Sequence, residues 1–333
     1  MMPRLKGIAA NCAVLVLAVA FSVAAFEFAC RAIVDDGMQY HIEMWKYANA
    51  LKRQSEDPAI GHEHRPNAAA RLMGVDVAIN GLGDRGPRLI IPKPRGVFRI
   101  VMLGDSLTFG WGVTESDLFV NRVAAELNRQ GVAVETVNLG VGNTNTAMQT
   151  ASFERRIASL DADLVVLNYF INDAEPTPSV AGSAGWIARN LVAYPVVGGA
   201  WDALKRSMFG APEWKRYYRD LYADDAAGWQ ATQSAFRRLA ALCRDRKLPL
   251  IVVNLPELRE LDPYPFADVT AKVQTLATAE EALFFDATQA VAAERPSDLW
   301  VTVPDPHPNA RAHALIGKFI AEGIAASDLM SAQ

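Results

Sequence analysis

The sequence has few cysteines and histidines and little net charge. It contains three cysteines and five histidines in 333 residues. Because Cys12, Cys30 and Cys243 are scattered, a disulfide framework and a cysteine-based zinc cluster are excluded. The 33 basic and 37 acidic residues leave a net charge of −4, which gives no general electrostatic indication of nucleic-acid binding. We therefore set nucleic-acid binding aside, and since no motif indicates a cofactor, we expect none.

One long uncharged apolar stretch, residues 7–26, lies at the N-terminus after Arg4 and Lys6. About 20 helical residues cross a hydrocarbon core, whereas the apolar part of a cleaved signal peptide is usually about 7–15 residues. The length therefore favours an uncleaved transmembrane anchor. Basic residues before the span predict a single-pass protein of the cytoplasmic membrane, with the rest of the chain on the extracytoplasmic, periplasmic side. The alternatives are a signal peptide cleaved near residues 22–24 and a buried core helix.

The chain divides by composition into three predicted parts. Residues 1–32 form the membrane anchor or signal segment, and residues 33–96 form a stalk and a small β element. Residues 97–333 form the main domain, which carries a helical insertion at about 175–225 with several tryptophans and tyrosines. A long insertion at a sheet edge is typical of a lid or a substrate wall. Alternatively, its aromatic side chains form a small core of their own.

Strands and helices alternate from Val97 onward. The first strand, at about 97–103, is almost wholly apolar, as expected of a strand buried on both faces of a parallel sheet. Further strands are predicted at 133–139, 164–170, 248–255 and 282–285, and helices at 116–130, 146–160, 226–247 and 309–325. This alternation predicts an α/β fold with right-handed crossovers and a mostly parallel five-stranded sheet with helices on both faces.

Residues that acyl-transfer chemistry needs are predicted at one edge of this sheet. Ser106 follows the first strand, and His307 precedes the last helix. A serine hydroxyl becomes a good nucleophile when an imidazole accepts its proton, and Asp305 fits as the carboxylate that orients this imidazole. A developing oxyanion requires N–H donors, and the candidates are the backbone of Ser106 and Gly142 and the side-chain amide of Asn172.

Each of these residues also has a purely structural interpretation when it is taken alone. The stretch Gly104-Asp105-Ser106 consists of turn-forming residues. His307 lies between prolines in a predicted loop, and Asn172 can cap the next helix. The occurrence of all of them at one sheet edge is what favours a catalytic site.

The same residues resemble the SGNH hydrolases, also called GDSL esterases and lipases. The resemblance covers roughly residues 97–326, with Gly104-Asp105-Ser106-Leu107 as the first sequence block and residues 305–309 as the last. It implies a flavodoxin-like three-layer α/β/α sandwich and serine ester hydrolysis. The expected protein is then a membrane-anchored member of this family, with Ser106, His307 and Asp305 as the catalytic triad.

Three departures from the family pattern bear on the site. The second block usually has glycine five residues after its asparagine, but Asn143 stands there and Gly142 precedes it. Asn143 is therefore the alternative backbone donor. Phe170 replaces the glycine usual before the family's catalytic asparagine, which is Asn172 here. Asp305 is only two residues ahead of His307, a spacing similar to that in alginate O-acetyltransferase relatives.

We therefore expect a serine esterase that hydrolyses acyl esters, such as acetyl esters, of a glycan or another envelope substrate through an acyl-enzyme. O-acyl transfer to a polysaccharide with the same triad is one alternative, and non-catalytic glycan binding is another. His62 and His64 flank Glu63 in a predicted solvated loop, where no third ligand completes a metal site. His313, on the closing helix, is predicted to be structural.

Overall fold

The computed structural model describes residues 2–177, 185–209, 214–303 and 305–330. It divides into two compact units. We call Met1–Asn49 with Ala181–Ala211 the helical unit, and Ala50–Val180 with Pro212–Gln333 the α/β unit. Parts of the predicted insertion, 178–184 and 210–213, and Pro304 of the predicted His307 loop lie outside the described residues. The predicted domain boundaries after residues 32 and 96 stay predictions.

The α/β unit is built on a five-stranded parallel sheet. Its strands, in the order β6-β5-β7-β8-β9, are β6 (Val134–Asn138), β5 (Phe98–Leu103), β7 (Leu164–Tyr169), β8 (Leu250–Asn254) and β9 (Leu283–Asp286). The chain passes from β5 to β6 on one side and then crosses back to β7 on the other. The loops after β5 and β7 therefore flank a switch point, where open α/β sheets bind their ligands.

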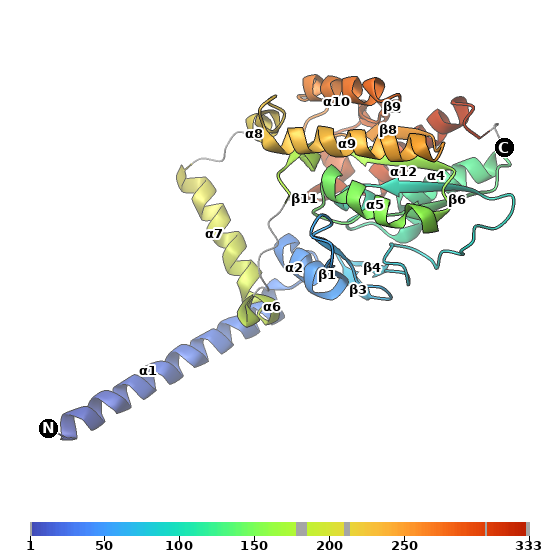
Figure 1. Cartoon of the computed structure of the whole chain (residues 1–333). Helices are drawn as coiled ribbons and strands as arrows, with labels where there is room; N and C mark the ends of the chain where they lie inside the picture. The colour runs from blue at the N-terminus through green and yellow to red at the C-terminus, as the bar shows by residue number, and fades with distance from the viewer. Residues whose placement is uncertain (1, 178–184, 210–213, 304, 331–333) are drawn as a thin grey trace. The chain divides into compact units, whose positions relative to one another are not determined.

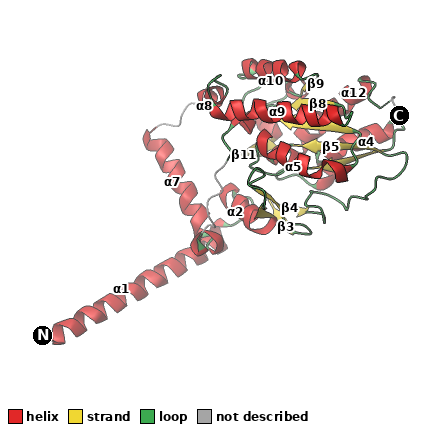
Figure 2. Ribbon diagram, in the orientation of Figure 1, coloured by secondary structure: helices red, strands yellow, loops and turns green. Residues whose placement is uncertain are grey.

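Helices cover both faces of this sheet (Figures 1 and 2). The helices α4 (Phe119–Arg129) and α12 (Ala310–Ala326) pack on one face, and α5 (Thr146–Leu160), α9 (Ala227–Asp245) and α10 (Ala267–Ala279) on the other. Along β5, Ile100 and Met102 join the first core, whereas Val101 and Leu103 join the second. This alternation explains why the strand is almost wholly apolar and confirms the predicted flavodoxin-like three-layer sandwich.

The elements differ from those expected at three places. The helix α10 was not predicted, since it contains only three large apolar residues among alanines, threonines and polar residues. The segment around His307, expected as a loop, is the short strand β11 (Asp305–Pro308), which pairs antiparallel with β10 (Trp300–Thr302). The stalk prediction also missed a hairpin of two charged three-residue strands, β1 (Lys52–Gln54) and β2 (His62–His64). The predicted small β element is the next hairpin, β3 (Ala69–Leu72) with β4 (Val75–Ala78).

The helical unit joins the N-terminal segment to part of the predicted insertion. It contains α1 (Met2–Ala29), the π-helical turn Cys30–Val34, α2 (Tyr40–Leu51), α6 (Trp186–Asn190) and α7 (Ala193–Phe209). The Glu27 carboxylate accepts the backbone N–H groups of Val192 at 3.0 Å and Ala193 at 2.9 Å. Because these N–H groups start α7, the end of α1 caps that helix. Cys30 and Ile42 form a small buried cluster with the same two residues.

The other described helix of the insertion, α8 (Trp214–Leu221), belongs to the α/β unit. Trp214 and Tyr218 contact the buried ring of Phe266 edge-on, with ring centroids 5.2 and 5.7 Å apart. The aromatic residues of the insertion therefore do not form one core of their own.

One helical segment, Ala10–Val34, is long and apolar enough to cross a membrane, with a mean hydropathy of 2.3. Its apolar side chains, such as Val16 and Phe21, are exposed. By length and composition this segment agrees with the predicted anchor and contradicts the alternative of a buried core helix. A signal sequence near the N-terminus can also satisfy this criterion of length and composition.

His313, buried on α12, is expected to make the stability of the protein sensitive to acid. Its Nδ1 accepts the backbone N–H of Phe119 at 2.9 Å, so this nitrogen carries no proton. Burial lowers the pKa of His313 from 6.5 to about 3. The unfolded chain therefore binds a proton near pH 6.5, but the folded protein binds it only near pH 3. The neutral His313 side chain therefore makes its full contribution to the free energy of unfolding above pH 6.5, and this contribution is lost as the pH falls towards 3.

The substitution His313→Gln removes this titration. We expect the difference in unfolding free energy between wild type and variant to shrink by about 2 kcal/mol between about pH 7.5 and about pH 5. Urea unfolding at the two pH values measures it. A difference that stays constant would show that His313 is protonated equally in the folded and unfolded states.

Candidate active site

Ser106 begins the short helix α3 (Ser106–Phe109) at the carboxyl end of β5. Asp105 caps this helix, because its Oδ1 accepts the N–H of Leu107 at 2.8 Å. Burial raises the pKa of Asp105 to about 6, although the Leu107 N–H and the His307 imidazole act to lower it. The cap therefore fixes the turn that presents the Ser106 hydroxyl.

His307 and Asp305 reach Ser106 from strand β11. The Ser106 Oγ lies 2.9 Å from His307 Nε2, and His307 Nδ1 lies 2.5 Å from Asp305 Oδ1. A carboxylate only accepts hydrogen bonds, so Nδ1 carries the proton and Nε2 is free to accept one from the serine. Residues two apart on a strand point to the same face, which explains how the unusual two-residue spacing brings the carboxylate to the imidazole.

Asp305 is 1% exposed and remains ionised. Burial acts to raise the pKa of Asp305, but hydrogen bonds from His307 and Trp111 outweigh it and hold this pKa below its usual range. The indole Nε1–H of Trp111 donates to Asp305 Oδ2 at 2.8 Å. Sequence reasoning missed Trp111, whose only signal is its place in the glycine-flanked stretch shortly after Ser106.

The loop after β6 packs against the turn that carries Ser106. The Val141 N–H donates to Gly104 O at 3.2 Å, and the Thr144 hydroxyl, which donates to Val141 O at 2.7 Å, lies 3.5 Å from the same Gly104 oxygen. Gly140 permits this approach, because a Cβ atom there would lie 2.2 Å from the backbone nitrogen of Phe109. Gly142 and Asn143, the alternative donors of this loop, are therefore held next to the serine turn.

Asn143 has a φ of 63°, the left-handed conformation that glycine adopts most readily. Asparagine is among the residues that tolerate it best. The backbone at position 143 thus adopts a conformation that glycine favours, although the residue is asparagine.

Asn172 lies on the 3-10 turn Ile171–Ala174 that follows β7. Its side-chain amide is among the groups that lower the pKa of Asp105, so it lies next to the residue that precedes Ser106. Phe170, at the position expected for glycine, donates its backbone N–H to Asp173 Oδ2 at 3.1 Å. The hydrogen bond from the Phe170 backbone to the Asp173 side chain therefore fixes this loop, where the family usually has glycine.

The structure thus links Ser106, His307 and Asp305 by hydrogen bonds and places Asn143 and Asn172 on the loops on either side. The prediction of a solvated loop around His62 and His64 is wrong, because these residues form strand β2 and His64 is 2% exposed. Within the part of the chain that the structure describes, no group of three or more His, Cys, Asp or Glu side chains could hold a metal ion.

Comparison with known proteins places this site in a family. A family model described as the GDSL-like Lipase/Acylhydrolase family matches residues 102–315, which include Ser106, Asn172 and His307. Comparison with curated proteins gives no match. Among solved structures, a variant of Axe2, an acetyl-xylooligosaccharide esterase from Geobacillus stearothermophilus, is 15% identical, with a TM-score of 0.45 over 68% of this chain and 94% of that chain. LAE5, an α/β hydrolase from the Lake Arreo metagenome, is 16% identical, with a TM-score of 0.46 over 68% of this chain and 95% of that chain.

Proposed function

The chain belongs to the GDSL-like lipase/acylhydrolase family, and we propose that it is a serine esterase in which Ser106 forms an acyl-enzyme. The observation that carries the proposal is the continuous series of hydrogen bonds from the Ser106 hydroxyl through His307 to Asp305, at 2.9 and 2.5 Å. A hydroxyl, an imidazole and a buried carboxylate in this order form the arrangement that activates serine in other hydrolases.

In the proposed reaction, Ser106 Oγ attacks the ester carbonyl carbon while its proton passes to His307 Nε2. Asp305 stabilises the imidazolium that forms. The bond between the carbonyl carbon and the alcohol oxygen then breaks, and the imidazolium gives its proton to the leaving alkoxide. Water, deprotonated by His307, attacks the acyl-enzyme and releases the carboxylic acid and free Ser106.

The negative oxygen of the tetrahedral intermediate needs donors that are already in place. We assign the backbone N–H of Ser106, the side-chain amide of Asn172 and a backbone N–H of the loop after β6 to this role. In that loop the donor belongs to Gly142 or to Asn143. Asn143 is exposed whereas Gly142 is buried, which favours the N–H of Asn143.

We propose an acyl ester of an extracytoplasmic glycan, such as an acetyl ester, as the substrate. The basic residues before the apolar segment support an extracytoplasmic location, and the segment itself supports attachment to the cytoplasmic membrane. The ring of Tyr217 on α8 is 43% exposed, and its hydroxyl donates to Glu175 Oε1 at 2.8 Å. Because Glu175 follows the Asn172 turn, this ring offers an apolar surface for a sugar near the site.

A fluorophosphonate probe tests the proposal directly, because it reacts only with an activated serine. We expect the full-length protein to be labelled and the Ser106→Ala variant to remain unlabelled at equal thermal stability. Mass spectrometry of the labelled peptide identifies the modified residue. Equal labelling of both proteins would contradict an acyl-enzyme on Ser106. Ester hydrolysis at the wild-type rate in the Ser106→Ala variant would show that the Ser106 site is not catalytic and would leave glycan binding as its role.

O-acyl transfer to a saccharide is the second candidate, favoured by the two-residue spacing between Asp305 and His307. In this reaction a sugar hydroxyl replaces water in the second step. The products of an acetyl donor with and without a saccharide acceptor separate the two functions. A hydrolase yields the same free acetate in both, whereas a transferase yields acetylated saccharide.

A further inference from the structure

The hairpin of β1 and β2 has two chemically different faces. Its register pairs Lys52 with His64, Arg53 with Glu63 and Gln54 with His62. Because side chains alternate along a strand, Arg53 and Glu63 point to one face, and Lys52, His62 and His64 point to the other.

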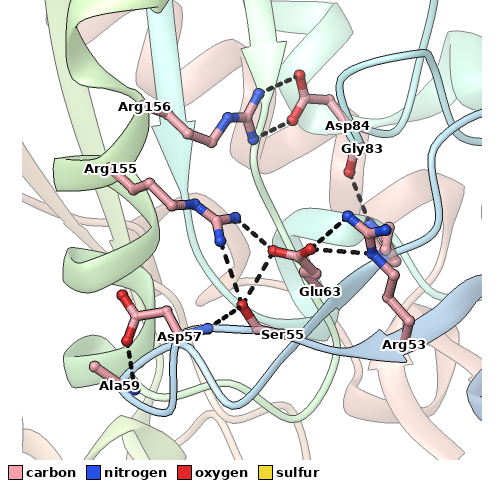
Figure 3. Close-up of polar contacts among 10 residues, drawn as sticks. Arg53, Ser55, Asp57, Ala59, Glu63, Gly83, Asp84, Arg155 and Arg156 are labelled. Atoms are coloured by element: carbon pink, nitrogen blue, oxygen red, sulfur yellow. Dashed lines mark hydrogen bonds and ion pairs between the residues drawn. The ribbon is translucent and has the colours of Figure 1, made fainter.

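An ion pair between Glu63 and Arg155 attaches the Arg53 face to α5 (Figure 3). Glu63 accepts Arg53 Nη2 at 2.7 Å with one oxygen and pairs with Arg155 of α5 through the other. Asp84, shortly after the second hairpin, accepts both terminal nitrogens of Arg156 at 2.6 and 2.8 Å. Since α5 begins directly after the loop that carries Gly142 and Asn143, the hairpin and this loop share one support.

The opposite face converges on a single backbone oxygen of that loop. Lys52 Nζ donates to Gly142 O at 3.0 Å, and His62 Nε2 lies 3.1 Å from the same oxygen. A carbonyl oxygen only accepts, so His62 Nε2 carries the proton. Burial lowers the pKa of Lys52 to about 8 and that of His62 to about 4. At neutral pH the oxygen therefore receives one charged and one neutral hydrogen bond.

A carbonyl held in this way fixes the direction of the N–H group in the same peptide. The cis peptides of the described chain are Ile91-Pro92 and Asp262-Pro263, so the peptide from Gly142 to Asn143 is trans, and its N–H points away from its C=O. The carbonyl faces the hairpin, and the exposed Asn143 therefore directs its N–H to the opposite side. Hydrogen bonds to a carbonyl also polarise the peptide and strengthen its N–H as a donor.

We propose that Lys52 and His62 are positioning residues that orient and polarise the Gly142–Asn143 peptide so that the Asn143 N–H stabilises the oxyanion. This inference rests on the proposed esterase function and names the source of the third donor. The donor is strengthened where charge develops in the transition state, so the effect falls on kcat rather than on KM.

Hydrolysis of p-nitrophenyl acetate by the full-length protein tests this role. Removing an oxyanion donor costs about 10²–10³ in kcat, and weakening one costs less. We expect Lys52→Met to lower kcat about tenfold to about 100-fold, with KM within about twofold of wild type. Lys52→Arg, which keeps a cationic donor, is expected to recover most of the loss. The matched control is Arg53→Met, the neighbouring residue on the other face, which leaves kcat at the wild-type value.

Four outcomes are informative. A fall in kcat for Lys52→Met that Lys52→Arg recovers supports the inference, as does a similar fall for His62→Leu should Lys52→Met fail to fold. Wild-type kcat in both Lys52→Met and His62→Leu overturns the inference and leaves the proposed function intact. An equal fall in Arg53→Met shows only general damage to the hairpin and also overturns it. A wild-type protein without Ser106-dependent hydrolysis overturns both the proposed function and this inference.

Discussion

Replacing either Ser106 or His307 by alanine is expected to lower kcat for ester hydrolysis by about 10⁵–10⁶-fold, and replacing both is expected to lower it no further. The two side chains act in one step, since the hydroxyl is a weak nucleophile until the imidazole accepts its proton. Once either is absent, the other contributes nothing to that step. The remaining rate comes from the oxyanion donors and from substrate binding.

The measurement compares kcat of the two single variants and the double variant with the same ester. His313→Gln is the matched control, because His313 is a buried histidine six residues after His307 whose partner is a backbone N–H. It is expected to keep wild-type kcat at neutral pH. Losses that multiply in the double variant would contradict the proposal, because they would show that Ser106 and His307 act independently.

Replacing Asp305 by asparagine is expected to lower kcat by about 10⁴-fold with little change in KM. The carboxylate keeps the proton of His307 on Nδ1 and stabilises the imidazolium. An amide removes the charge, and an N–H directed at Nδ1 would move the proton to Nε2, which then cannot accept the serine proton. The loss therefore arises from the wrong tautomer as well as from the missing charge.

Trp111→Phe is the control for this variant. It removes the indole donor to Asp305 but keeps the carboxylate. Because the Asp305 carboxylate is ionised, this hydrogen bond is charge-assisted and contributes about 1.5–3 kcal/mol, which corresponds to about 10-fold to about 150-fold in rate, well below the loss expected for Asp305→Asn. Steady-state kinetics of both variants at about pH 7.5 separate the two contributions. A loss of less than about 100-fold in Asp305→Asn would assign the orientation of His307 to another group.

The central sheet could be predicted because strands buried on both faces have a recognisably apolar sequence. The strands β5, β7 and β8 are covered on both faces, and each appears as a largely apolar run whose predicted ends lie within two residues of the observed ones. The hairpin of β1 and β2 has no apolar pattern that would predict it, since its six residues are charged or polar. Its position depends on the ion pair between Glu63 and Arg155 of α5, which are 92 residues apart in the chain.

The candidate triad could be predicted because serine chemistry requires particular residue types at the sheet edge. The contacts that hold the candidate site in place could not be predicted from the sequence. Lys52 lies 90 residues from Gly142, and Trp111 lies 194 residues from Asp305. A lysine or tryptophan in these places has no local pattern to distinguish it from any other. The same holds for Glu27, whose contact with the start of α7 spans 165 residues and assigns part of the insertion to the helical unit.

That contact decides how the enzyme can be shortened to a soluble form. Val192 and Ala193 are buried against Cys30 and Ile42, and Glu27 caps the helix that follows. Truncation of residues 1–49 alone would uncover these side chains next to the exposed rings of Tyr194 and Trp201, and the product would tend to aggregate. Replacing residues 181–211 with a short polar linker in the same variant removes the apolar side chains on both sides of this contact. The shortened protein must begin before Lys52, because Lys52 contacts the loop of the site.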